Sequence, residues 1–302
     1  MSTSPQQAFD QGEVPNARAV GMGGALNALG VSTASLFLNP ANMALAKVYH
    51  LEAFAAYSPE AKRQTYGGAV VDSVINSAHI AGGLGGSWNE YDPSGIDRRW
   101  TDIRGGLAFP LGDYLALGAT VRWLRADQGL GTGPFGTSYA SDGNNGPLFN
   151  SITLDAGATV SLGDSFRIGL VGHNLTNPGT ALAPVVGAVG VGYTTPTFSI
   201  EGDGSLDFTT FGSARGRLAA GGEYFAADHY ALRLGWRRDW GTAINSGSIG
   251  LGYVDPKWSI EISVRRDFIS HDAETLGIVS LRYFYDAVGS QPTPDQGGDM
   301  LR

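Results

Sequence analysis

His229-Tyr-Ala-Leu-Arg-Leu-Gly-Trp-Arg-Arg-Asp239 is the stretch that decides the fold of this chain. Tyr230, Leu232, Leu234 and Trp236 occupy every second position, and Arg233 lies between two of them. Successive side chains of a β-strand point to opposite faces, so this spacing predicts a strand with one apolar face and one charged face.

The same alternation recurs from about residue 50 to residue 285. It predicts fourteen strands, near 50–58, 63–72, 77–89, 100–110, 113–125, 151–162, 165–175, 186–195, 197–208, 216–226, 229–238, 247–254, 257–267 and 276–285. A soluble β-sandwich would also alternate, with its apolar face inward. Alternation alone therefore does not say whether the apolar face meets lipid.

The composition narrows the class of protein. Of 302 residues, 45 are Gly, none is Cys, and only 16% are charged, whereas soluble domains have roughly 7% Gly and about 25% charged residues. No apolar run approaches the roughly 18 residues of a membrane helix, so a membrane-spanning form of this chain must use strands. The net charge of −8 argues against a nucleic-acid partner.

The lengths of the predicted connections favour a membrane barrel over a sandwich. The even-numbered connections are tight, at 73–76, Gly112, 163–164, Pro196, 227–228 and 255–256. The odd-numbered ones include every long loop, at 90–99, 126–150, 176–185, 209–215, 239–246 and 268–275, and only the first, 59–62, is short. Outer-membrane barrels combine short periplasmic turns with longer extracellular loops. The sequence therefore predicts an all-β, transmembrane, antiparallel barrel of about fourteen strands in a bacterial outer membrane.

Aromatic residues lie near many predicted strand ends, among them Trp100, Tyr230 and Trp258. Aromatic girdles at both interfaces are typical of membrane barrels. Ordinary strand aromatics would be distributed in the same way, because aromatic residues favour strands.

Residues 1–48 do not alternate and are rich in small apolar residues. They predict two short helical or looped pieces, with Ser32 as a possible N-cap and Pro40 as a helix breaker. A barrel of about fourteen strands has a lumen wide enough to hold such a segment. We therefore expect a plug at 1–48, a barrel at 49–285 and a flexible periplasmic tail at 286–302.

Two motifs in this N-terminal segment carry a family resemblance. Asn16-Ala-Arg-Ala-Val-Gly-Met-Gly-Gly-Ala25 and Asn39-Pro40-Ala41 resemble the hatch of the FadL-type long-chain fatty acid transporters and of the related PorV-like barrels. The resemblance implies an outer-membrane barrel of fourteen strands whose hatch occludes the lumen. The hatch residues that it marks are Gly21, Gly23, Gly24, Asn39, Pro40 and Ala41.

The resemblance implies two alternative functions. A transport barrel would pass hydrophobic, fatty-acid-like molecules through the hatch and release them sideways into membrane lipid, and the glycines of the third strand, Gly82, Gly83, Gly85 and Gly86, are then candidates for the lateral gate. Close packing against the hatch is the other explanation of these glycines. A PorV-like barrel would instead anchor a surface or periplasmic protein complex, with the loops 126–150 and 176–185 as docking surfaces.

The predicted lumen face is rich in charge, and most of these charges should pair across strands or with the hatch. Four arginines of the last strands are also candidates to hold a ligand carboxylate, because a guanidinium can grip it with two hydrogen bonds. They are Arg233, Arg237, Arg265 and Arg282.

The sequence predicts no catalytic residue, cofactor or metal site. The five histidines are scattered, and no Gly-x-Ser-x-Gly elbow occurs. Gly131-Thr-Gly133-Pro-Phe-Gly136 fits a nucleotide-binding pattern, but it lies in the longest loop and opens no helix. Residues 1–7 lack the basic and apolar regions of a signal peptide, so we expect the sequence to be a mature form.

Overall fold

The structure is a computed structural model, and it describes residues 16–74, 80–91, 98–128, 147, 149–180, 183–268 and 273–285. The predicted tail 286–302, residues 1–15 of the predicted plug and most of the loop 126–150 lie outside these ranges. No helix within them is long and apolar enough to cross a membrane.

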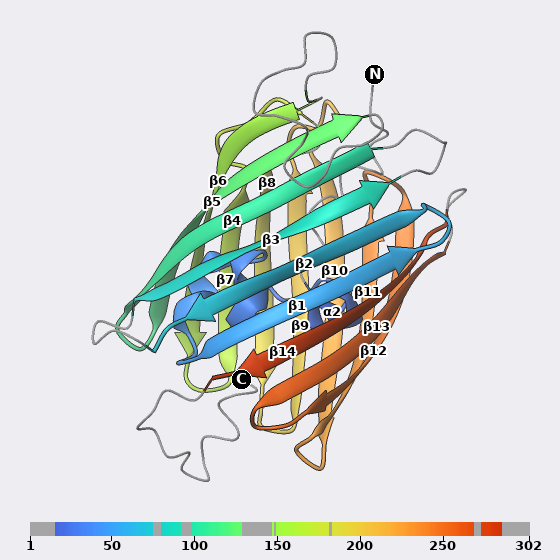
Figure 1. Ribbon diagram of the computed structural model, residues 1–302. Helices are drawn as coiled ribbons and strands as arrows, with labels where there is room; N and C mark the ends of the chain where they lie inside the picture. Colours follow the sequence, from blue (N-terminus) through green and yellow to red (C-terminus); the bar gives the residue numbers. More distant parts are fainter. Residues whose placement is uncertain are drawn as a thin grey trace.

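Fourteen strands form one closed antiparallel barrel, in which each strand pairs with its sequence neighbours and β1 pairs with β14 (Figure 1). The prediction of an antiparallel barrel of about fourteen strands is confirmed. The strands are β1 (Tyr49–Ser58), β2 (Arg63–Asp72), β3 (Ala81–Tyr91), β4 (Arg98–Leu111), β5 (Leu115–Gln128), β6 (Phe149–Leu162), β7 (Phe166–His173), β8 (Val186–Thr194), β9 (Phe198–Asp207), β10 (Arg215–Ala226), β11 (Tyr230–Asp239), β12 (Ile244–Val254), β13 (Trp258–Phe268) and β14 (Thr275–Phe284).

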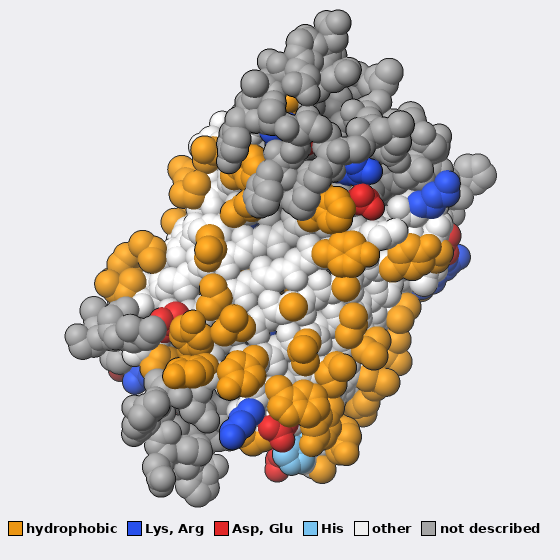
Figure 2. Space-filling view, in the orientation of Figure 1, with side chains coloured by type: hydrophobic (Ala, Val, Ile, Leu, Met, Phe, Trp, Pro, Cys, Tyr) orange, Lys and Arg blue, Asp and Glu red, His pale blue; other side chains and the backbone are white. Residues whose placement is uncertain are grey.

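The two faces of the wall reverse the burial pattern of a soluble protein. On β13 the exposed and buried positions alternate along the whole strand. Ile262 is 55% exposed on the outside, whereas the charged neighbour Glu261 is 2% exposed on the inside. Apolar side chains spread over the outer surface, as Figure 2 shows for one side. An outward apolar face and an inward charged face are what a lipid-embedded barrel requires.

The two ends of the barrel differ in their connections. We call the end where β1 begins and β14 ends the short-turn end, because its connections 112–114, 163–165, 195–197, 227–229 and 255–257 have three residues each. The opposite, long-loop end carries connections of four residues, at 59–62 and 240–243, up to twenty, at 129–148. The predicted sorting of connection length between the two ends is thus largely present.

Two predicted connections fall in the wrong length class, since one predicted long loop is short and one predicted tight turn is long. The connection after β11 is only 240–243, since β12 begins at Ile244 instead of residue 247. The first residues of β12 show little apolar alternation in the sequence. The strand nevertheless includes them, and its inward Ser246 donates a hydrogen bond to Asp267 of β13 over 2.7 Å. The connection between β2 and β3 spans 73–80 and is the long exception at the short-turn end.

Aromatic side chains line the outside of the short-turn end. The rings of Tyr230 and Tyr253 lie 5.5 Å apart, and those of Tyr253 and Trp258 lie 5.4 Å apart. Trp100 departs from the predicted girdle, because it is buried inside the barrel under the guanidinium of Arg63, 5.5 Å from its ring centre. A strand-end aromatic on the inner face contacts the lumen instead of lipid.

At the long-loop end, Glu60 ties the first connection to the last strands. Its carboxylate accepts hydrogen bonds from Arg266 at 2.5 Å and from the Thr275 amide at 3.0 Å. Burial alone would raise the pKa of Glu60, but these hydrogen bonds outweigh it and lower the pKa to about 2. The carboxylate is therefore charged at neutral pH, beside the seam where β1 meets β14.

Residues 16–48 lie inside the barrel, and we call them the lumen segment (Figure 1). They contain a short α-helix, α2 (Ala17–Gly21), and two 3-10 helices, η1 (Ser32–Leu36) and η2 (Pro40–Ala44). The segment contacts the inner wall at β11–β14 through α2 and at β4–β6 through η2. It therefore crosses the lumen from one side of the wall to the other.

A charge placed on the outer wall tests its contact with lipid. Leu234, in the middle of β11, is 66% exposed, and we expect Leu234→Arg to lower the free energy of unfolding in vesicles by about 2–4 kcal/mol. Leu111, equally outward but at the strand end, is the control, and Leu111→Arg should cost about 0–1 kcal/mol. Urea unfolding in phosphatidylcholine vesicles measures both, and equal small losses would contradict a lipid-embedded outer wall.

Candidate functional site

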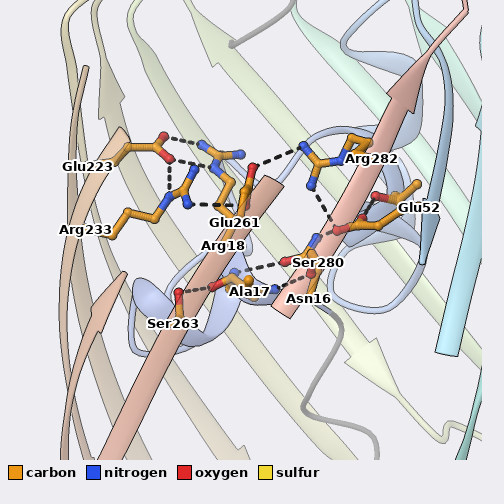
Figure 3. Close-up of polar contacts among 12 residues, drawn as sticks. Asn16, Ala17, Arg18, Glu52, Glu223, Arg233, Glu261, Ser263, Ser280 and Arg282 are labelled. Carbon is orange, nitrogen blue, oxygen red and sulfur yellow. Dashed lines mark hydrogen bonds and ion pairs between the residues drawn. The ribbon is translucent and has the colours of Figure 1, made fainter. Parts of the chain in front are cut away.

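The helix α2 is held by serine hydroxyls of the wall. The Ala17 amide donates to the Ser280 hydroxyl over 2.8 Å, and the Ser263 hydroxyl donates to the Ala17 carbonyl over 2.7 Å (Figure 3). The Asn16 side chain caps the helix by accepting from the Ala19 amide. A helix of five residues leaves most of its backbone groups without internal partners, so the wall has to supply them.

An alternating row of charges joins α2 to the wall (Figure 3). Arg18 donates two hydrogen bonds to Glu223 of β10, at 2.9 and 3.1 Å. Glu223 also accepts from Arg233 of β11 at 2.5 Å, and Arg233 reaches Glu261 of β13 at 3.2 Å. All four side chains are buried. Each charge needs its opposite neighbour, because an unpaired buried charge is strongly destabilising.

A second part of this row reaches β1. Arg282 of β14 donates to Glu52 of β1 over 3.2 Å and lies 3.8 Å from Glu261. Glu52 also accepts hydrogen bonds from Asn16, at 3.2 Å, and from Thr33. Asn16, at the start of the lumen segment, and Thr33, near its middle, are therefore bound to the same wall carboxylate.

Two carboxylates of β9 bind the backbone of residues 26–29. Asp203 accepts from two consecutive amides at 3.0 and 3.1 Å, and Glu201 accepts from the next two at 2.5 and 2.9 Å. These amides lie in a turn without helical partners of their own. Inward carboxylates on neighbouring positions of one strand therefore orient this turn.

The predicted motif Asn39-Pro40-Ala41 forms the start of η2. The Asn39 side chain accepts from the Ala41 amide and donates to the Asn27 carbonyl over 2.7 Å. It also donates to the Thr159 hydroxyl of β6 over 3.1 Å. Asn39 thus caps a helix and joins the two halves of the segment to the wall.

The glycines of the predicted hatch motif fit against glycines of the wall. A Cβ atom on Gly235 of β11 would lie 2.1 Å from the Gly23 nitrogen. Gly23 itself has φ +69° and faces the Trp236 backbone, and Gly24 has φ +89°. A Cβ on Gly21 would lie 2.8 Å from the Ser263 hydroxyl. These contacts require residues without side chains.

The β3 glycines face alternately inward and outward. Gly83 and Gly85 contact the lumen segment, since added Cβ atoms would lie 2.8 Å from the Met43 sulfur and 3.0 Å from a Leu36 methyl, respectively. Gly82 and Gly86 point outward. A Cβ on Gly82 would meet a Leu107 methyl at 3.6 Å, whereas a Cβ on Gly86 would lie 2.4 Å from the Asp102 carbonyl oxygen. β3 pairs with β2 and β4 from residue 82 to residue 91, so the wall is closed there.

The structure separates the four predicted ligand arginines into two pairs. Arg233 and Arg282 belong to the charge row that joins α2 to the wall. Arg237 and Arg265 line a cavity of about 130 Å³ on the long-loop side of the lumen segment. On the short-turn side, Arg18, Arg233 and neighbouring residues enclose only about 20 Å³.

Arg18 was not predicted as a site residue, although it binds the lumen segment to the wall. The signal available in the sequence was a single arginine among small apolar residues in a segment expected to be buried, which demands an acidic partner.

The described residues contain no group of three or more His, Asp or Glu side chains that could hold a metal ion. Residues 181–182 of the predicted docking loop 176–185 are not described.

No protein family model and no curated protein matches the chain. Solved structures match it over nearly their whole length. The CymD monoaromatic hydrocarbon channel has 14% identity and a TM-score of 0.67, over 90% of this chain and 97% of that one. The Ralstonia pickettii toluene transporter TbuX has 13% identity and a TM-score of 0.66, over 92% and 100%.

A Pseudomonas aeruginosa FadL homologue has 15% identity and a TM-score of 0.64, over 90% of this chain and 98% of that one. At these identities the likeness shows the fold alone. The resemblance to FadL-type barrels predicted from the N-terminal motifs is confirmed at that level.

Removal of the central carboxylate tests the charge row. Glu223→Gln leaves Arg18 and Arg233 with a neutral partner, and we expect the free energy of unfolding to fall by about 3–5 kcal/mol. Glu90→Gln is the matched control, since its pair with Arg99 is partly exposed and should contribute at most about 1 kcal/mol. Urea unfolding in vesicles measures both variants. Losses of similar size would contradict a larger contribution of the buried row to the free energy of unfolding.

Adjacent β3 glycines test the packing of the lumen segment. Gly83→Val forces a side chain against Met43 and Leu36, and we expect a loss of about 1–3 kcal/mol from overpacking. Gly82→Val places the same side chain outward and should cost less than about 0.5 kcal/mol. Thermal unfolding in detergent compares the two, and a larger loss for the outward variant would contradict the described facing of β3.

Proposed function

We propose that this chain is an outer-membrane channel for hydrophobic small molecules, and that the lumen segment is its hatch. The observation that carries the proposal is the unequal filling of the lumen. Among the described residues, the segment leaves a cavity of about 130 Å³ toward the long-loop end, and the pocket lined by Arg18 and Arg233 toward the short-turn end has about 20 Å³. A molecule entering from the long-loop end would meet a pocket and then an obstruction.

The outer surface supports the location. Its apolar belt suits a bilayer, and the sorting of connection lengths suits long loops outside the cell and short turns in the periplasm. Two of the similar structures reported above are described as a monoaromatic hydrocarbon channel and a toluene transporter. The proposed setting is therefore a Gram-negative outer membrane, with the lumen cavity on the extracellular side of the hatch.

The contacts of the hatch support its movement. Much of its attachment consists of hydrogen bonds and ion pairs, such as Arg18 with Glu223 and residues 26–29 with Asp203 and Glu201. Unlike packed apolar contacts, contacts of this kind can be exchanged for hydrogen bonds to water when the hatch moves and water enters the lumen. A cavity of about 130 Å³ is close to the size that takes up one benzene molecule. A longer, fatty-acid-like molecule would therefore need the hatch to shift.

We also propose that the exit is lateral, through the glycine run of β3. The hatch presents Leu36 and Met43 to the inner side of this run, and on the outer side Gly82 and Gly86 carry no side chain of their own. Exit would require the β3 ladder to open, because β3 is fully paired in this structure. The PorV-like anchoring role has no comparable support among the described residues.

A reversible crosslink tests the movement of the hatch. The chain has no cysteine, so Ala17→Cys with Ser280→Cys, whose backbone amide and hydroxyl lie 2.8 Å apart, would introduce the only possible disulfide. We expect oxidation to stop toluene entry into protein-loaded vesicles and reduction with dithiothreitol to restore it, because the locked hatch cannot move.

The two single-cysteine variants are the controls, and their toluene entry should not respond to oxidation. Equal entry through the oxidised and reduced double variant, with the disulfide verified by mass spectrometry, would contradict a mobile hatch. Absence of entry through every form would contradict the channel itself.

A further inference from the structure

An apolar part of the inner wall lies beside the lumen cavity. It is formed by inward side chains of β14, β1 and β2, namely Leu276, Ile278, Phe54, Ala56, Ala69 and Val71. Val20 of the lumen segment belongs to the same apolar cluster as Phe54, and Phe37 belongs to the same cluster as Val71. Val20 and Phe37 also line the cavity of about 130 Å³. A hydrophobic molecule in that cavity is therefore close to an apolar stretch of wall that leads toward β3.

Three side chains cover the inner face of the wall where β2 meets the glycine run of β3. Leu36 and Met43 of the lumen segment cover the run itself. The third is Phe54 of β1, which lies opposite Gly67 of β2. A Cβ atom on Gly67 would lie 2.3 Å from the Phe54 Cζ atom and 2.7 Å from the Gly86 carbonyl oxygen. The Phe54 ring therefore lies over the backbone of β2, next to the glycine run.

Phe54 differs from the other two side chains because it belongs to the wall. Leu36 and Met43 would move with the hatch, whereas Phe54 is held by β1, which pairs with β2 along its whole length. The Phe54 ring meets the Phe37 ring of the hatch edge to face, at 84° and with the ring centres 6.3 Å apart. Of the three covering side chains, Phe54 alone would therefore remain between the cavity and the glycine run after the hatch has shifted.

We propose that Phe54 limits the size of the molecules that pass from the lumen cavity to the glycine run of β3. The proposal rests on the proposed function, in which this run is the exit, and it assigns to one wall residue the discrimination among hydrophobic molecules. The Gly67 backbone lies directly behind the ring, and closely packed groups of this kind have little room to yield. A molecule on this route would have to pass on the lumen side of the ring, in the space left by Phe37.

The expected size limit follows from the side chain itself. Replacement of Phe54 by Ala would free the space of one six-membered ring beside the glycine run. Toluene contains one such ring and 1-methylnaphthalene contains two fused rings, and both molecules are uncharged and apolar. A ring that only filled the core would affect the passage of both molecules alike, through a loosened hatch. The ratio of the two uptake rates therefore separates a size limit from a packing role.

Uptake by cells tests the proposal. A Gram-negative host that expresses the whole chain in its outer membrane is compared with the same host carrying an empty vector. Uptake is normalised to the amount of folded barrel, measured by heat-dependent migration on gels. We expect Phe54→Ala to raise the ratio of 1-methylnaphthalene uptake to toluene uptake by about tenfold, since small differences of fit in an apolar site change discrimination by this order. Phe54→Leu, which keeps part of the apolar bulk, should raise the ratio less.

Phe225→Ala is the matched control. Phe225 of β10 is also an inward phenylalanine, and it is 8% exposed where Phe54 is 5% exposed. It lines the small pocket beside Arg18 of the hatch, on the opposite side of the barrel from β3. The variant thus removes the same side chain near the hatch but off the route, and its uptake ratio should stay within about twofold of the wild-type ratio.

An unchanged ratio in Phe54→Ala would overturn the proposal. An equal rise in Phe225→Ala would also overturn it, because a loosened hatch would then explain both results. If Phe54→Ala does not fold, Phe54→Leu is judged by the same outcomes. Wild-type toluene uptake no faster than that of the empty vector would contradict the channel and, with it, the size limit. Toluene uptake through the wild type with an unchanged ratio in the Phe54 variants would leave the channel and overturn only the size limit.

Discussion

The charges on the inner wall need partners inside the lumen, and the rest of the structure is arranged around that need. A barrel of fourteen strands surrounds more space than wall side chains can fill, and Glu223, Glu201 and Asp203 point into it. The lumen segment supplies what these carboxylates require, through Arg18 and the amides of residues 26–29. Wall and segment are therefore incomplete without each other, in the sense that each buries polar groups that only the other satisfies.

The abundance of glycine follows from the same arrangement. Where the segment touches the wall, the two backbones approach so closely that a side chain on the wall residue would collide, as at Gly235 with Gly23 and at Gly221 with Met22. The inner wall therefore combines long charged side chains, which reach the segment, with glycines, which admit it. The strand pattern alone gives no reason for this composition.

Much of the barrel could be predicted because its signals are local. Period-two alternation and connection length gave the strand number and the two ends. The errors arose where residues of the inner face decide the start of a strand or the facing of a side chain. The start of β12 carries polar lumen residues such as Ser246, and Trp100 was assigned to the girdle although its side chain faces inward. Arg233 and Arg282 each pair with carboxylates of nearby strands, which the register of the strands decides. The cavity position of Arg237 and Arg265 depends on how the lumen segment lies against the wall. A single sequence does not reveal that relation.

The three-residue connections at the short-turn end have a consequence for recognition. Apart from the connection 73–80, the described connections leave this rim with little loop surface, and tyrosine and tryptophan rings line its outside. In the proposed orientation, a periplasmic component that approaches the barrel along its axis would therefore meet little loop surface around the lumen segment. On this side, the lumen segment would be the surface by which one such barrel differs from another.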